Sequence, residues 1–407
     1  MKKSFKSTTK IGIYIITLVL SAVLLIVGHS LVYDREVMFQ GGIEDGASKA
    51  VVTKIIREIK NEYSYDENHI LQDLLVVFEC EITSGEHKGE KVFAEESIQA
   101  TDAQKIETVE VGDKIIVTES EGQVCDFIMY EYDRIGPLWV LGIVFVLLVL
   151  VFGGFKGVNT IVSLGFTCAA VFTVFLPSVM AGRNIYFWAI ITCIYITVMT
   201  LLITNGYTRK TLSAIIGCSS GVLVSGILTV IFSNVTKLTG ITSQETIYIR
   251  DDFNIDLKAL VFAGIVLGAL GAVMDVSMSI SSSLRELYDK LPEPTFKSLF
   301  KSGITIGRDI MGTMANTLVL AYIGCELSAT VLLVAYSSSI TTLFAVEKIV
   351  VEVMNALVGS LGILLTIPLT AAVSSLLYIT ENKDPHKKDK YYVEPSEEPD
   401  LFQKTES

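Results

Sequence analysis

The chain has 407 residues, of which 51% are hydrophobic, and a formal net charge of −12. Its mean hydropathy is +0.54, and its 19% of charged residues is too few for a soluble globular chain of this length. The composition therefore excludes a wholly soluble protein and predicts that much of the surface faces lipid.

Eight apolar runs are long enough to cross a hydrocarbon core of ~30 Å, which takes about 20 helical residues. We expect each run to be a helix, because a helix satisfies its own backbone hydrogen bonds in lipid. The runs are Ile11–Val32, Leu138–Gly154, Gly157–Val179, Asn184–Thr204, Thr211–Asn234, Ala259–Ser281, Asp309–Ala335 and Val353–Ile379.

These runs predict four parts of the chain. Residues 1–32 form a cytoplasmic N-terminus and an anchoring helix, and 33–137 form a domain outside the membrane. Residues 138–380 form a membrane domain of seven helices, and 381–407 form a flexible cytoplasmic tail. The first run has the preceding lysines of a signal peptide, but its length and the lack of a clean cleavage site favour a retained anchor.

Basic residues in short loops predict the orientation, because they mark the cytoplasmic side. With the N-terminus inside, every basic cluster falls inside, including Arg209 with Lys210 and the group from Arg285 to Arg308. We therefore expect both termini in the cytoplasm and the long segment after the anchor outside the cell.

The segment from Tyr33 to Gly136 is strongly acidic. It holds 24 acidic and 10 basic residues, a net charge of −14, so the rest of the chain is near +2. This charge argues against nucleic acid or anionic lipid as a partner of the outside domain.

Short stretches rich in Val, Ile and Phe predict strands in this segment, at Ala50–Ile56, Leu74–Ile82 and Lys114–Glu119. Turn sequences at Ser84–Glu90 and Val111–Asp113 separate them. We expect a small β-rich domain, either an OB-like or SH3-like barrel or a sandwich. Its Cys80 and Cys125 form either a disulfide, which an oxidising exterior permits, or two buried thiols.

Polar residues at membrane depth are the main chemical signal, because an aspartate at a helix centre costs roughly 2.5 to 3.5 kcal/mol on insertion scales. Asp275 lies ten residues before Arg285, near the predicted midplane, on a stripe of glycines that continues to Ser279. The spacing predicts that this stripe is buried against another helix. A packing contact remains the alternative to a functional role for Asp275.

Two later helices repeat this theme. Asn316 and Thr317 lie deep in one of them, whereas Arg308 and Asp309 are expected near the interface. In the last helix, Pro368 frees a backbone carbonyl beside Thr366, and broken backbone of this kind is tolerated where it lines protein or a cavity. We expect these features to converge with Asp275 on a polar pathway. Secondary candidates stand at its outer entrance, in a stretch that we expect to be an amphipathic helix and not a separate span: Glu347, Glu352 and Asn355.

Three segments resemble those of the YibE/F-like family of bacterial multi-pass membrane proteins: Gly271–Ile280, Gly307–Leu318, and Leu357–Ser360 running to Pro368–Thr370. The resemblance implies an N-terminal anchor, an outside β-rich domain and a helical bundle in the bacterial plasma membrane. It implies no catalytic residues.

Three classes of function remain open. The four histidines all lie outside the seven-helix core, and nucleotide-binding and HExxH motifs are absent, so we expect no enzyme, metal or cofactor, although an intramembrane hydrolase stays open. A gradient-driven or partner-coupled transporter of a small solute or ion is favoured. The alternative is a receptor, sensor or scaffold that acts through the outside domain.

Besides the bilayer, a second copy of the chain or another membrane protein is a candidate partner, and nucleic acid is not.

Overall fold

The computed structural model describes residues 2–32, 47–66, 69–101, 108–119, 124–337 and 339–380. The predicted tail, 381–407, lies outside the described residues. Contacts divide the chain into two compact units: Met1–Tyr33 with Asn159–Ser407, and Asp34–Val158. Each unit is described by itself.

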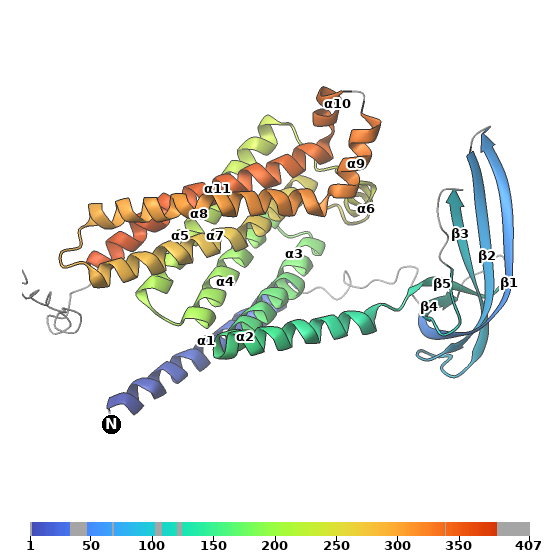
Figure 1. The fold of residues 1–407 in the computed structure, drawn as a ribbon, viewed down its shortest axis with the longest axis horizontal. Coiled ribbons are helices and arrows are strands. Elements are labelled where there is room, and N and C mark those ends of the chain that lie inside the picture. Colours follow the sequence, from blue (N-terminus) through green and yellow to red (C-terminus); the bar gives the residue numbers. More distant parts are fainter. Residues whose placement is uncertain are drawn as a thin grey trace, which may run out of the picture. The chain divides into compact units, whose positions relative to one another are not determined.

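Five strands form a closed barrel in the second unit, in the order β1–β2–β3–β5–β4 with β4 closing onto β1 (Figure 1). All pairs are antiparallel except β3 with β5. This Greek-key closure is that of OB-type barrels, so the predicted barrel is confirmed and the sandwich is wrong. The strands are β1 (Ser48–Asp66), β2 (His69–Ile82), β3 (Lys91–Thr101), β4 (Lys114–Glu119) and β5 (Phe127–Tyr132).

Alternating apolar residues of the strands fill the barrel core, as in Val76 and Phe78 on β2 and Ile115 and Val117 on β4. The predicted turns join the strands where expected. Gly85 and Gly89 both have φ of +90° between β2 and β3. Backbone of this kind favours glycine because it has no Cβ.

Cys80 and Cys125 are buried free thiols, so the second of the two sequence alternatives holds. Burial raises the pKa of Cys80 to about 11. Burial raises the pKa of Cys125 as well. A raised pKa lowers the reactivity of a thiol, because the thiolate is the nucleophile.

A break divides the first long helix after the barrel. Helix α2 (Ile135–Ala170) contains Gly154, whose φ of 51° and ψ of −130° are not helical. Because its backbone bends there, the carbonyl of Val149 closely approaches Gly157. The break falls between the two predicted runs Leu138–Gly154 and Gly157–Val179.

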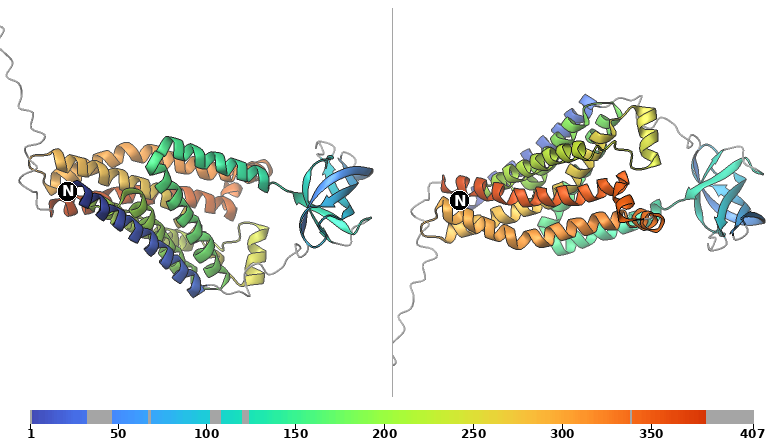
Figure 2. Two further views of the ribbon diagram at one scale, coloured as in Figure 1. Left: turned by 90° about the horizontal axis from the view of Figure 1, so that it is seen from below. Right: turned by 90° about the horizontal axis from the view of Figure 1, so that it is seen from above.

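The helical unit contains α1 (Lys2–Val32) and the chain from the second part of α2 onward. Helices α5, α7, α8 and α11 run side by side along most of their lengths (Figures 1 and 2), and α1 packs against α4 and η1. The remaining elements are η1 (Val171–Phe175), α3 (Leu176–Met180), α4 (Ile185–Asn205), α5 (Arg209–Val235), α6 (Gln244–Phe253), α7 (Leu257–Lys290), α8 (Phe296–Cys325), α9 (Leu327–Tyr336), α10 (Ile340–Ala345) and α11 (Glu347–Ile379).

Six helices in the described part of the chain are long and apolar enough to cross a membrane. A seventh candidate is the pair α8 and α9, which bends by 69° at the break between them. The run predicted as Asp309–Ala335 is therefore not straight, and α8 begins well before it, at Phe296.

Small and hydroxylic residues form the seam between the antiparallel helices α5 and α11. A Cβ at Gly217 would meet Thr370, and a Cβ at Gly221 would meet Thr366. On α11 the corresponding glycine is Gly362, which faces Ser225. Because each small residue receives a larger one from the other helix, the two backbones approach closely along this seam.

Candidate functional site

Asp275 lies in the middle of α7 and its side chain is exposed. Gly264, Gly268, Gly271 and Ser279 follow the same helical stripe, at spacings of three and four residues, and are exposed too. The prediction that this stripe is buried is therefore wrong. The buried faces of α7 are those toward α5 and α11, where residues such as Val273 and Ser277 lie.

The Asp275 carboxylate has no hydrogen-bond or ion-pair partner among the residues that the structure describes. Gly264 and Gly271 likewise have open space where a Cβ would stand. One spanning helix thus presents an unpaired acid on a face almost free of side chains.

A second polar face belongs to α8. Asp309, Gly312, Thr313, Asn316 and Thr317 are all exposed, and the contacts of α8 with α11 are made on its other side, through residues such as Gly307 and Leu318. The two threonine hydroxyls donate to backbone carbonyls of their own helix. Asn316 therefore presents its side-chain amide on an exposed face of α8.

Arg308 and Asp309 have no ion-pair partner within the described ranges. The two side chains are both exposed and do not neutralise one another. The α8 face therefore carries both signs of charge as well as an amide.

The contacts between α7 and α8 set the two polar faces at one level. Gly268 of α7 faces Tyr322 of α8, and further along Leu284 faces Gly303. These two contacts show that α7 and α8 are antiparallel. Counting residues inward from each contact places Asp275 level with residues 312–315 of α8. The structure thus brings Asp275 to the depth of Thr313 and Asn316, without a hydrogen bond between them.

Thr366 does not lie on an exposed face as Asp275 and Asn316 do. It is fully buried, its hydroxyl donates to the carbonyl of Gly362 at 2.7 Å, and it faces Gly221 in the seam with α5. The prediction that it lines the pathway is contradicted by this packing.

Pro368 lies inside α11, which continues without a break from Glu347 to Ile379. The predicted broken backbone is therefore not observed. The stretch with Glu347, Glu352 and Asn355 is the first part of this same helix and not a separate span.

The three secondary candidates at the start of α11 have local partners. Glu347 accepts hydrogen bonds from the amides of Thr239 and Gly240 at 2.7 and 2.5 Å, and from the Thr239 hydroxyl at 2.8 Å. Glu352 accepts from Asn355 at 3.2 Å. These acids hold the loop after α5 and the helix start, which is a structural role.

Tyr322 is a residue that sequence reasoning missed. Its hydroxyl is buried beside Gly268 and has no hydrogen-bond partner in the described part of the chain. A tyrosine among apolar residues gives no signal by sequence alone. The glycine across from it becomes informative only when the helix register is known.

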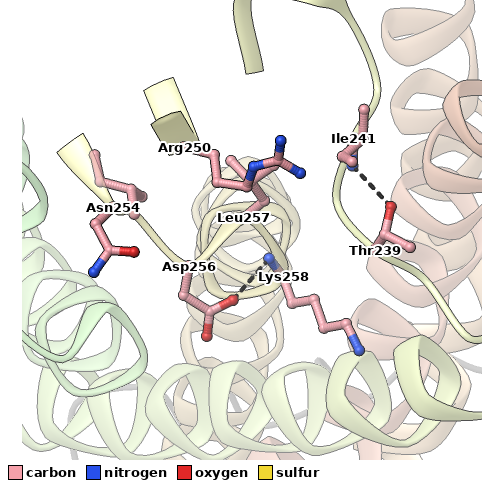
Figure 3. Close-up of a pocket in the computed structure, with 8 residues that line it drawn as sticks. Thr239, Ile241, Arg250, Asn254, Asp256, Leu257 and Lys258 are labelled. Atoms are coloured by element: carbon pink, nitrogen blue, oxygen red, sulfur yellow. Dashed lines mark hydrogen bonds between the residues drawn. The ribbon is translucent and has the colours of Figure 1, made fainter. Parts of the chain in front are cut away.

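A hollow of about 390 Å³ lies where α6 meets the start of α7 (Figure 3). Two of its three charged side chains are already engaged: Asp256 accepts from the backbone amides of Lys258 and Ala259 and caps α7, and Arg250 pairs with Asp251 at 2.8 Å. Because this hollow is open and its acid is a helix cap, we assign it no role.

No group of three or more His, Cys, Asp or Glu side chains within the described residues is arranged to hold a metal ion. The chemistry that α7 and α8 offer is therefore that of a carboxylate, an amide and hydroxyls beside exposed backbone.

Helices of this length and composition, packed as a bundle and joined to a small barrel, define a multi-pass membrane protein. The family model described as YibE/F-like protein matches residues 141–380, more than half of the chain, so the chain belongs to the YibE/F-like family. Comparisons with curated proteins and with solved structures found no match.

Proposed function

We propose that this protein is a transporter of a small solute or ion, driven by a gradient or by a partner protein, with a polar pathway around Asp275. The observation that supports it is an exposed, unpaired carboxylate in the middle of a spanning helix. An aspartate there costs roughly 2.5 to 3.5 kcal/mol on insertion scales, and contact with lipid leaves that cost uncompensated. Water or a substrate cation in a pathway compensates it.

The α8 face supports the same proposal. Asn316 and Thr313 are exposed at the depth of Asp275, so two helices offer polar groups at one level. Beside Asp275, Gly271 presents backbone with no side chain over it, which leaves room for a solute.

Flux into proteoliposomes tests this function. We propose to follow protons with an entrapped pH dye, and Na⁺ and K⁺ with ion-selective dyes, for the wild type and for Asp275→Asn at equal incorporation. The amide keeps the shape of the carboxylate but holds no charge, so Asp275→Asn should lose ion-coupled flux, and Ser279→Ala should reduce it less. Asp289→Asn is the control, since Asp289 ends the same helix in a pair with Arg285. Equal flux for wild type and Asp275→Asn at every pH would contradict the proposal.

We further propose eight crossings in a bacterial plasma membrane, with both termini in the cytoplasm and residues 33–137 outside. The candidate span Ile135–Met180 has 46 residues, about twice what one crossing needs, and it is broken at Gly154. An impermeant thiol reagent on intact cells should label a cysteine placed at Ser84 and spare one placed at Ser302. Labelling of the second alone would reverse the orientation.

A receptor or scaffold is the second candidate. Gly264 and Gly271, which have open space where a Cβ would stand, give α7 a face on which a helix of a second copy or of another membrane protein would pack closely. Deleting residues 34–137 separates the two functions. A transporter should keep part of its flux, whereas a receptor that acts through the barrel should lose its output.

A further inference from the structure

Arg308 of α8 is a cation that the transport proposal leaves without a role. Its side chain is exposed, and no carboxylate pairs with it among the residues that the structure describes. Asp275 of α7 is exposed and unpaired in the same part of the chain. A free cation and a free anion on two spanning helices each carry a desolvation cost, which a partner of opposite charge offsets.

The two charges lie on the sides of α7 and α8 that meet each other. The helices are in contact where Gly268 of α7 faces Tyr322 of α8. Asp275 follows Gly268 by seven residues, which is close to two helical turns. Arg308 precedes Tyr322 by fourteen residues, which is close to four turns. Asp309 is rotated from Arg308 by about 100° around α8 and lies away from this side.

The two charges also lie at neighbouring depths. Asp275 is level with residues 312–315 of α8. Arg308 stands four to seven residues from that level, about 6 to 10 Å along the helix axis. Two charge-assisted hydrogen bonds of about 2.8 Å each, one from each residue, leave a few ångströms between them over such a spacing. The spacing therefore fits a molecule with an ammonium and a carboxylate a few atoms apart.

We propose that the pathway carries a small zwitterion, a solute with one ammonium and one carboxylate, such as a neutral amino acid. Asp275 accepts from the ammonium, and the Arg308 guanidinium donates two parallel hydrogen bonds to the carboxylate. Ser279 lies one turn from Asp275 toward the depth of Arg308, and its exposed hydroxyl is a further donor for the carboxylate.

A zwitterion compensates both residues at once. A cation alone leaves Arg308 without a partner, and an anion alone leaves Asp275 without one. This substrate class rests on the proposed transport function, because it assigns a solute to the same polar pathway.

Binding to the purified full chain tests the substrate class without a driving force. The thermal midpoint is measured in detergent while one solute at a time is titrated. The zwitterions are the neutral protein amino acids, β-alanine and γ-aminobutyrate, and the singly charged solutes are ethanolamine and lactate. A ligand that binds only the folded chain raises this midpoint. We expect at least one zwitterion to raise it and neither singly charged solute to do so at the same concentrations.

Variants of the two charged residues locate the bound zwitterion. Arg308→Gln should raise the concentration for half of the maximal shift at least about tenfold, because a charged contact is lost. Arg308→Lys keeps the charge but not the planar fork and should raise it less, and Asp275→Asn should raise it as Arg308→Gln does. Lys301→Gln should leave it unchanged, since Lys301 is an exposed cation, unpaired within the described residues, two turns nearer the start of α8.

The proposal is overturned if no zwitterion raises the midpoint, or if Arg308→Gln binds the zwitterion as well as the wild type does. Binding of ethanolamine that depends on Asp275 and not on Arg308 would make the solute a simple cation. The transport function is judged separately, by ion-coupled flux in the wild type and Asp275→Asn. Flux that depends on Asp275 would leave that function standing under any of these outcomes. A zwitterion bound through Arg308 without such flux would instead favour a receptor.

Discussion

Glu95 is buried in the barrel wall, with 2% of its surface exposed. Its carboxylate accepts hydrogen bonds from the amides of Val124 and Cys125 at 2.7 and 3.0 Å. Removing a buried acceptor of this kind leaves both amides unpaired, which costs more than the hydrogen bonds themselves contribute.

We therefore expect Glu95→Ala to destabilise the barrel by about 2 to 4 kcal/mol, since a charged acceptor and two amides are involved. Glu95→Gln, which keeps one acceptor oxygen, should cost less. Urea unfolding of residues 34–137 measures both. Glu58→Ala is the control because Glu58 is exposed on β1, and an equal effect of Glu58→Ala would show that Glu95 has no special role.

His87 lies between two carboxylates, with Nδ1 2.9 Å from Glu90 and Nε2 2.7 Å from Glu119. The hydrogen bond to Glu90, and then the charges of both carboxylates, raise the pKa of His87. A raised pKa contributes stability that is full below the unfolded value of about 6.5 and is lost as pH rises through the folded value.

The Tm of residues 34–137 should therefore fall more between pH 6 and pH 8.5 in the wild type than in His87→Gln. The difference between the two curves isolates His87 from the other titrating groups. Parallel curves would mean that the two carboxylates do not hold the protonated ring.

At the scale of elements, the seam between α5 and α11 rests on small residues. A Cβ at Gly221 would come within 3.0 Å of the Thr366 Cβ and closer to its hydroxyl. Overpacking of this kind costs typically 1 to 3 kcal/mol.

We expect Gly221→Ala to lower the thermal midpoint of the full chain in detergent, and a second change, Thr366→Ala, to recover part of the loss by clearing the hydroxyl. Gly165→Ala on α2 is the control, because nothing lies within 4 Å of a Cβ there. A loss in Gly165→Ala as large as in Gly221→Ala would show that helix packing at the seam is not the cause.

The sequence predicts elements better than it predicts which face of each element is covered. The apolar runs locate the helices because length and hydropathy suffice for that, and the turn glycines locate the barrel strands. The sequence predicts burial of the stripe with Asp275, because small residues usually mark a helix contact. In the structure, the seam with Gly217 and Gly221 is buried and the Asp275 stripe is open, although both are rich in small residues.

The same limit applies to the candidate site. Depth follows from counting residues along a helix, so the common level of Asp275 and Asn316 was predictable. Which face of a helix is buried depends on the neighbouring helices, so the burial of Thr366 was not predictable from the sequence. Tyr322 carries no sequence signal, since it becomes notable only through the lack of a hydrogen-bond partner in the described part of the chain.

For the whole molecule, the barrel has its own core and lies in a compact unit separate from the bundle. Residues 34–137 expressed alone should therefore be soluble and give a β-type circular dichroism spectrum with a cooperative thermal transition. A disordered spectrum would show that the barrel depends on the membrane helices for folding.

We propose above that the open faces of α7 and α8 line a wet pathway. Its most direct test is the reaction of an impermeant, water-dependent thiol reagent with single cysteines in a background lacking the six native ones. If the pathway is wet, Ser279→Cys and Asn316→Cys should react, whereas Leu223→Cys and Leu361→Cys, on exposed apolar faces of α5 and α11, should not. Failure of both pathway positions to react, in protein that folds and inserts, would contradict it.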